Sequence, residues 1–209
     1  MKDIKEIFRL GMTAPEVVVK IIEMNPRISD VVFKIFSPPK NLSEESVPWI
    51  RTSLHRMVFH QPPGAEDTLL LKRKEITLQN LSQIVRKLAG KKVLAMTSDL
   101  KLFNTDERFH IPMMDFDCEI SCENLEVIQR FLRISNKGGV ILQSGRSYHY
   151  YGIELIPDRE WLMLLGRFLL LMDYTDLRYI AHRIIDGYGS LRISENERRP
   201  IPPKVVAIV

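Results

Sequence analysis

The stretch Met113-Met-Asp-Phe-Asp-Cys-Glu-Ile120 places two carboxylates, Asp115 and Asp117, within a run that predicts a strand over residues 109–120. Because successive strand side chains alternate between faces, both aspartates are predicted to point the same way, with Phe116 opposite. Such a pair suits Mg2+, which uses one or two carboxylates and completes its octahedron with phosphate oxygens and water. The alternative interpretation is a solvated strand face beside a turn.

A second polar cluster lies in residues 143–152, QSGRSYHYYG, where Ser144, Arg146, Ser147 and His149 fall within six positions. On an extended chain Ser147 and His149 share a face. The Arg146 guanidinium is a planar donor fork suited to phosphate, and the hydroxyls and imidazole can add further hydrogen bonds. These residues predict a triphosphate clamp. The alternative is a polar strand end whose tyrosines pack on a hydrophobic face.

A third polar segment, residues 173–183, reads DYTDLRYIAHR. Asp176 stands where a helix is predicted to begin, so its ordinary role is that of an N-cap. Arg192, on a short strand predicted over residues 190–193, could pair with a carboxylate. Taken singly, these residues do not indicate a catalytic site.

The composition is that of an ordinary globular protein, with 209 residues, 45% hydrophobic and 27% charged. The net charge of +4 admits a polyanionic partner without requiring one. Two cysteines, Cys118 and Cys122, are too few for a disulfide framework or a four-cysteine zinc site. The opening residues lack a signal-peptide core, and the apolar run 161–172 is too short for a membrane span. We therefore expect a cytoplasmic protein without a membrane partner.

Helical and strand patterns alternate along the chain without internal repeats, which predicts a mixed α+β class. A break near residue 67 divides a smaller N-terminal α/β lobe, residues 1–67, from residues 68–209, which end in a proline-rich basic tail. The two parts are expected to form one compact unit. Residues 49–59 could be strand or helix. Helices are predicted over 13–24, 77–90, 125–136, 161–172 and 177–185, and strands over 31–36, 93–96, 109–120, 140–142, 148–155 and 190–193.

Together the three clusters match a known pattern, because 32 positions separate Asp115 from Ser147 and 29 separate Ser147 from Asp176. An Asp-x-Asp motif, a Ser-x-His motif preceded by a basic residue, and a third acid after a hydrophobic stretch resemble the archaeo-eukaryotic primase superfamily. The resemblance covers roughly residues 93–194. It implies a primase-polymerase-like core with a mixed or antiparallel sheet flanked by helices.

The resemblance also implies template-directed nucleotidyl transfer by a DNA primase or polymerase in replication or repair. Asp115, Asp117 and Asp176 would hold two Mg2+ or Mn2+ ions, and Asp173 competes with Asp176 as the third acid. The expected partners are nucleoside triphosphates, a single-stranded or primed DNA template, and a separate helicase or primase accessory subunit. The residues expected to bind the nucleotide are Ser144, Arg146, Ser147, His149 and Arg192.

The chain departs from many primase small subunits because its only cysteines are Cys118 and Cys122, so it lacks their zinc-binding insertion. The alternative function is a noncatalytic nucleic-acid-binding or replication-initiation module that keeps the primase-like fold. Such a module would follow a phosphate backbone with basic residues. The candidates are Lys72, Arg73, Lys74, Lys87, Lys91 and Lys92. A third hypothesis, a metal-dependent nuclease, explains the Arg146–His149 cluster less well than a triphosphate does.

Overall fold

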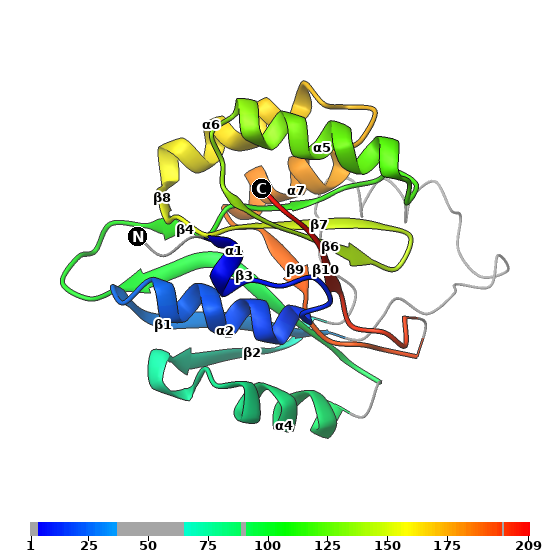
Figure 1. Ribbon diagram of the computed structural model, residues 1–209. Helices are drawn as coiled ribbons and strands as arrows, with labels where there is room; N and C mark the ends of the chain where they lie inside the picture. The colour runs from blue at the N-terminus through cyan, green and yellow to red at the C-terminus, as the bar shows by residue number, and fades with distance from the viewer. Residues whose placement is uncertain (1–3, 37–64, 89–90, 198) are drawn as a thin grey trace, which may run out of the picture.

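The computed structural model describes residues 4–36, 65–88, 91–197 and 199–209, and these residues form two antiparallel sheets with flanking helices (Figure 1). Their elements are α1 (Ile4–Ile7), α2 (Ala14–Met24), β1 (Ile28–Phe36), β2 (Ala65–Lys72), η1 (Arg73–Glu75), α4 (Leu78–Leu88), β3 (Val93–Leu102), β4 (Phe109–His110), β5 (Met113–Asp115), α5 (Cys122–Ile134), β6 (Gly139–Ser144), β7 (Ser147–Gly152), β8 (Ile156–Pro157), α6 (Asp158–Leu169), α7 (Leu177–Asp186), β9 (Ser190–Arg192) and β10 (Lys204–Ile208).

The larger sheet has the strand order β2-β1-β3-β4-β8, and β9 also pairs with β3. The first half of β3 pairs with β9, with Ala95 opposite Arg192, and its second half pairs with β4, with Asp99 opposite His110. Helix α2 packs against this sheet through its buried face, Val17, Val18, Ile21 and Ile22. The long central strand β3 thus carries elements from distant parts of the sequence.

The smaller sheet has the order β10-β6-β7-β5, and its two faces have different neighbours. Met114 and Tyr150 point toward α5, α6 and α7, where Trp161 and Phe168 are fully buried. Met113, on the opposite face, belongs to the core that also includes the larger sheet. Since side chains alternate along a strand, Asp115 lies on the same side as Met113, facing the region between the sheets.

The α+β class with antiparallel sheets and flanking helices is confirmed. The helix predicted from Thr13 is present, and its capping box is complete, with Glu16 accepting hydrogen bonds from the Thr13 backbone and hydroxyl at 2.6 Å. Most other predicted helices and strands occur within a few residues of their expected positions. No helix that the structure describes combines the length and the apolar character needed to cross a membrane.

Two sequence predictions were wrong. The single strand expected over 109–120 is instead two short strands, β4 in the larger sheet and β5 in the smaller. Pro112 lies between them and cannot donate to a ladder, which explains the break. The expected C-terminal tail contains β10, which pairs with β6 and buries Val205 in the core shared with the larger sheet and Ala207 in the core beside α5, α6 and α7.

The boundary expected at residue 67 falls inside β2, which pairs with β1 along most of its length. Side chains of α2 and β1 share a core with residues of β3, β6, β7 and β9. The division of the chain into a lobe and a core stays a prediction. The described N-terminal strands β1 and β2 belong to the same sheet as β3, β4, β8 and β9. The segment 49–59, left open as strand or helix, lies outside the described residues.

Candidate functional site

A polar cavity of about 340 Å3 lies where the smaller sheet meets β9 of the larger one. Each sheet contributes chemically active side chains: β5 and β7 supply Asp115 and His149, and β9 supplies Arg192. The remaining lining comes from the start of the larger sheet, from α7, and from the segment after β9. These further residues are Phe36, Val93, Tyr179, Arg183, Ser190, Leu191, Asn196 and Arg199.

Asp115 and His149 lie opposite each other on adjacent strands, so the β5–β7 pairing fixes their contact. The Asp115 Oδ1 atom is 3.4 Å from His149 Nε2. The two side chains differ in access to solvent, because His149 is 3% exposed and Asp115 is 40% exposed. The pair therefore presents a solvent-accessible carboxylate supported by a buried imidazole.

Arg192 reaches from the larger sheet to the smaller. Its guanidinium donates to the Ser144 hydroxyl at 3.1 Å, to the carbonyl of Ser194, and to the Ile201 carbonyl at 3.5 Å. Only 8% of the residue is exposed. Burial, and secondarily the positive charge of Arg199, lower the pKa of Arg192 to about 10. Arg192 is thus a buried cation whose charge is incompletely compensated.

Among the described residues, the buried polar atoms without a hydrogen-bond partner include His149 Nδ1 and Arg192 Nε, whose residues line this cavity, and Tyr151 Oη on the same strand as His149. Burial is the main cause that raises the pKa of Tyr151, so its hydroxyl is held neutral. An unsatisfied buried polar group costs about 1–3 kcal/mol, so folded proteins retain few of them. Two of these atoms belong to residues that line the cavity, so a bound ligand can supply the missing partners.

The segment after β5 is attached to the other two predicted clusters through its backbone. Phe116 N–H donates to the Tyr148 carbonyl at 2.9 Å, and Asp117 N–H donates to the Tyr174 carbonyl at 2.8 Å. The Ser147 hydroxyl accepts from Cys118 N–H at 3.1 Å. These bonds explain why three clusters distant in sequence meet, and they give Ser147 a structural role.

None of the other predicted acids lines the cavity. Asp117 is exposed beyond the end of β5. Asp176 caps α7, with its Oδ1 accepting from the N–H groups of Arg178 and Tyr179 at 2.8 and 3.1 Å. Asp173 is exposed. Within the described parts of the chain, no three His, Cys, Asp or Glu side chains form a group that could hold a metal ion.

Two predicted nucleotide-binding residues lie behind or beside the cavity. Ser144 is buried, and its hydroxyl accepts a hydrogen bond from Arg192, so it orients that guanidinium. Arg146 is exposed and lines a different cavity, of about 650 Å3, together with Arg199. The structure therefore brings together Asp115, His149 and Arg192, with Ser144 supporting Arg192.

Sequence reasoning missed the contribution of α7. Tyr179 and Arg183 lie four residues apart on one face of this helix and both line the cavity. The Arg183 guanidinium lies 5.1 Å from the Tyr179 ring centre and donates to the Ser190 hydroxyl at 2.9 Å and to Asp186 at 2.9 Å. Their i, i+4 spacing is visible in the sequence, but only the tertiary structure shows what the face contacts.

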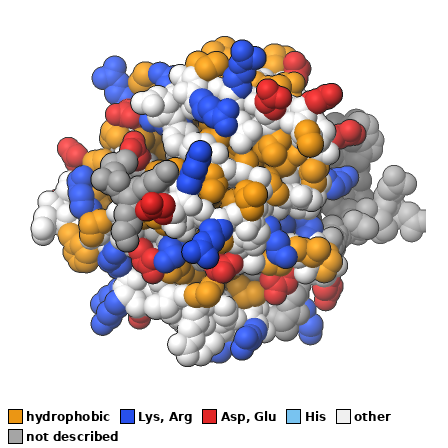
Figure 2. Space-filling view, in the orientation of Figure 1, with side chains coloured by type: hydrophobic (Ala, Val, Ile, Leu, Met, Phe, Trp, Pro, Cys, Tyr) orange, Lys and Arg blue, Asp and Glu red, His pale blue; other side chains and the backbone are white. Residues whose placement is uncertain are grey.

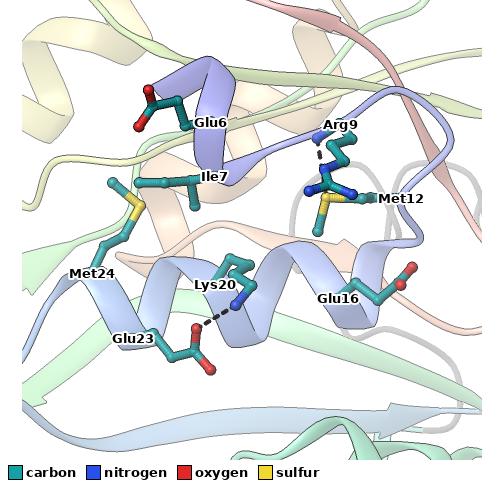
Figure 3. A pocket seen from close by; sticks show the side chains of 8 residues that line it. All are labelled: Glu6, Ile7, Arg9, Met12, Glu16, Lys20, Glu23 and Met24. Carbon is teal, nitrogen blue, oxygen red and sulfur yellow. Dashed lines mark hydrogen bonds and ion pairs between the residues drawn. The ribbon is translucent and has the colours of Figure 1, made fainter. Parts of the chain in front are cut away.

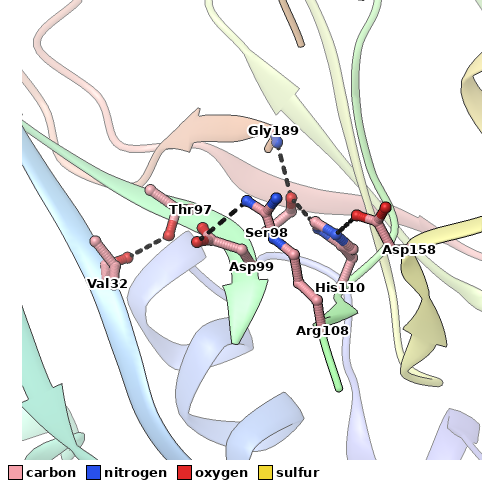
Figure 4. A network of polar contacts seen from close by, with 8 residues as sticks. All are labelled: Val32, Thr97, Ser98, Asp99, Arg108, His110, Asp158 and Gly189. Atoms are coloured by element: carbon pink, nitrogen blue, oxygen red, sulfur yellow. Dashed lines mark hydrogen bonds and ion pairs between the residues drawn. The ribbon is translucent and has the colours of Figure 1, made fainter. Parts of the chain in front are cut away.

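A buried polar network supports the turn that leads into β9 (Figure 4). Gly189 N–H donates to Ser98 Oγ at 2.7 Å, and Ser98 Oγ lies 3.0 Å from His110 Nδ1. His110 Nε2 lies 3.0 Å from Asp158 Oδ1, and the His110 ring stacks on Trp161. Burial is the largest cause that lowers the pKa of His110. The network positions Ser190 and Arg192 by fixing the residue that precedes β9.

A further cavity, of about 700 Å3, is lined by residues of α1, α2 and the segment between them (Figure 3). Its lining contains both acidic and basic side chains, and Lys20 Nζ lies 2.7 Å from Glu23 Oε2. Glu16 is used by the α2 capping box. None of the sequence-predicted site residues lines this cavity.

Comparison with known proteins gives one match. The family model described as Archaeo-eukaryotic primase 1D-like matches residues 72–204, more than half of the chain. Searches of curated proteins and of solved structures each found no match. The matched span begins at the end of β2 and includes Asp115, His149 and Arg192.

Proposed function

The chain belongs to the archaeo-eukaryotic primase-like family, and from this premise we propose that it is a template-directed nucleotidyltransferase, acting as a DNA primase or polymerase. The proposed substrates are a nucleoside triphosphate and a nucleic-acid template. In the reaction, a 3′-oxygen forms a bond to the α-phosphorus, and the bond to the departing pyrophosphate breaks.

The observation that carries this proposal is that Asp115, His149 and Arg192 line the same cavity between the sheets. A carboxylate and a guanidinium that line one cavity suit a ligand that is polyanionic and bound with a cation. Arg192 Nε and His149 Nδ1 have no protein partner among the described residues. A buried, preorganised donor such as Arg192 Nε acts more strongly on developing charge than a donor in water.

Asp115 offers an exposed carboxylate edge, and Asp117 follows two residues later. Asp117 does not line the cavity, so the proposed cation contact rests on Asp115; one carboxylate is sufficient, because Mg2+ is commonly bound by one or two carboxylates plus substrate phosphates. Mg2+ or Mn2+ bound there would neutralise charge on the triphosphate and lower the pKa of the attacking hydroxyl. His149 supports Asp115 from behind, and Arg192 holds phosphate oxygens. Tyr179 and Arg183 keep β9 in place.

The test is incorporation of a labelled nucleotide on a single-stranded template, with and without primer, in Mg2+ and in Mn2+. We expect metal-dependent products from the wild type and none from Asp115→Asn. Asp106→Asn is the matched control, because Asp106 is exposed in the loop between β3 and β4. Thermal unfolding of all three proteins shows whether a loss of product reflects a loss of fold. Equal activity in Asp115→Asn and Asp106→Asn would refute the assignment.

One observation favours a second candidate, a noncatalytic nucleic-acid-binding module with the same fold. The described residues hold no three-ligand metal group, and Asp176 already serves as a helix cap. A noncatalytic module would bind a nucleic-acid strand without incorporating nucleotides in either metal. Folded wild-type protein that binds DNA and yields no product in any lane would establish this second function.

A further inference from the structure

Helix α6 has an apolar face on the side that points to solvent. On its inner face, Trp161 and Phe168 are buried in the core beside the smaller sheet. Its outer face carries four large apolar side chains that are between 40% and 83% exposed: Leu162, Met163, Leu169 and Leu170. A helix with apolar residues on both faces is normally buried on both. No described part of this chain covers the outer face, so its composition indicates a partner.

Gly166 lies at the centre of the outer face. At 3.6 residues per turn, the four apolar positions fall within an arc of about 120° that has Gly166 in its middle. Glycine destabilises the interior of a helix relative to alanine. A Cβ atom at Gly166 would meet no described atom within 4 Å, so packing within one copy does not require glycine there. A second helix that approaches closely does require it, because the distance between packed helices depends on the side chains at their contact.

The outer face is symmetric about Gly166. Leu162 and Leu170 lie four residues before and after this glycine, and Met163 and Leu169 lie three residues before and after it. Consider a twofold axis that brings Gly166 of two copies together with their α6 helices antiparallel. This axis places Leu162 of one copy beside Leu170 of the other, and Met163 beside Leu169. A twofold dimer needs such self-complementarity, because both copies use the same patch.

The charges at the two ends of this face are complementary under the same symmetry. Arg159 lies seven residues before Gly166, and Asp173 lies seven residues after it, just beyond the end of α6. Both side chains are exposed. In the antiparallel pair, Arg159 of each copy therefore lies near Asp173 of the other. An unrelated partner protein would not need this internal symmetry, so the pattern favours a second copy of this chain.

The position of the outer face in the molecule suits such a contact. Figure 2 shows hydrophobic side chains at the upper edge of the molecule, where Figure 1 places α6. None of the residues named for the contact lines the candidate triphosphate cavity. Two copies joined through α6 would therefore both keep that cavity open.

We propose that the outer face of α6 binds the same face of a second copy, giving a twofold dimer with an antiparallel α6 pair. Leu162, Met163, Leu169 and Leu170 form its apolar seam, Gly166 lies at the twofold axis, and Arg159 pairs with Asp173 at each end. The dimer goes beyond the proposed function and does not depend on it, because its mass can be measured without nucleotide, metal or template.

The first experiment measures the mass and the dissociation constant of the full chain by sedimentation over a wide range of protein concentrations. We expect the wild type to reach twice the 24.3 kDa of one chain. Gly166→Gln should weaken the dimer about tenfold or more, because extra bulk in a packed contact is destabilising. The matched control is Leu10→Gln, which removes a side chain that is 68% exposed between α1 and α2 and should leave the dimer unchanged.

Thermal unfolding at high dilution separates the dimer contact from the fold. Glutamine favours a helix more than glycine does, so monomeric Gly166→Gln should unfold at the same temperature as the wild type or at a higher one. A weaker dimer in an equally stable or more stable monomer is a result that a folding defect cannot give.

The second experiment reverses the charges. Arg159→Glu and Asp173→Lys should each weaken the dimer about fivefold, since two exposed ion pairs are lost, and the double variant should restore the wild-type dissociation constant. Restoration supports the antiparallel arrangement in particular. A double variant as weak as the single variants overturns it.

Other results would also overturn the proposal. One is a wild type that stays monomeric at every concentration, and another is a dimer that Gly166→Gln leaves intact, because a different surface would then hold it. Monomeric wild type that binds vesicles of phosphatidylcholine and phosphatidylserine, and loses this binding in Leu162→Gln/Leu170→Gln, would assign the outer face to a lipid surface instead.

Discussion

Replacing Arg192 by methionine separates the stability of the fold from the chemistry of the site. The substitution keeps a long side chain that fills the same space, and it removes a guanidinium that is 8% exposed. Ser144 Oγ and the carbonyls of Ser194 and Ile201 lose their donor. The perturbation therefore has two opposing effects on stability and one effect on ligand binding.

The two stability effects nearly cancel. Three net hydrogen bonds at about 1 kcal/mol each represent a loss of about 3 kcal/mol. The pKa of Arg192, lowered to about 10 from 12.5, means that burial disfavours the charged form by about 2–3 kcal/mol once residual solvent screening is allowed for. Replacing Arg192 with methionine removes this cost, which stabilises the folded protein by a similar amount. We expect Arg192→Met to change the free energy of unfolding by less than about 1 kcal/mol.

Ligand binding should change much more. A hydrogen bond to a charged group contributes about 1.5–3 kcal/mol, so losing the guanidinium should weaken triphosphate binding roughly ten- to a hundredfold. Urea unfolding measures the first quantity, and calorimetric titration with a nucleoside triphosphate and Mg2+ measures the second. Arg178→Met, at an exposed position of α7, is the matched control and should change neither.

If Arg192→Met lowers the free energy of unfolding by more than about 3 kcal/mol and the remaining folded protein binds triphosphate as the wild type does, Arg192 is a structural residue. In that case the buried charge of Arg192 would have no functional explanation, and Arg192 would no longer be assigned to phosphate binding.

Two further predictions concern Asp176 and His110. Asp176→Ala should lower the free energy of unfolding by about 1 kcal/mol through loss of the α7 cap, whereas Asp176→Asn should keep the cap and stability. Lost nucleotide incorporation in Asp176→Asn at unchanged urea midpoint would identify the charge as a metal ligand, and retained incorporation would limit Asp176 to capping. Burial lowers the pKa of His110 below 6.5, so as pH falls through 6.5 the unfolded chain takes up a proton that the folded chain resists. Urea midpoints should therefore decrease below about pH 6.5, less steeply in His110→Gln; an identical decrease in both proteins would contradict this explanation.

Several parts of the fold could be read from the sequence because their signals are local. The Thr13-Ala-Pro-Glu16 box marks the start of α2, and Asp176 marks the start of α7, since capping depends on atoms within three residues. The break at Pro112 was missed because Phe109–Ile120 has strand character throughout. The chain crosses from one sheet to the other there, which no local preference encodes.

The candidate site, too, could be predicted only in part from the sequence. Sequence alone identified Asp115, His149 and Arg192 as chemically capable, because motif spacing constrains which residues can share a site. It could not show that Arg146 lines a different cavity, or that Arg199 connects the two.

The sequence by itself determined where α2 and α7 begin, because capping depends on neighbours along the backbone, and the spacing of its motifs indicated the family of the chain. Only the tertiary structure decided that Arg192 crosses between two sheets to reach Ser144, since the β3–β9 and β6–β7 pairings lie far apart in sequence. It also decided that the C-terminal segment forms β10 and one wall of the cavity that Arg146 lines, because an edge strand takes its place from the sheet it joins.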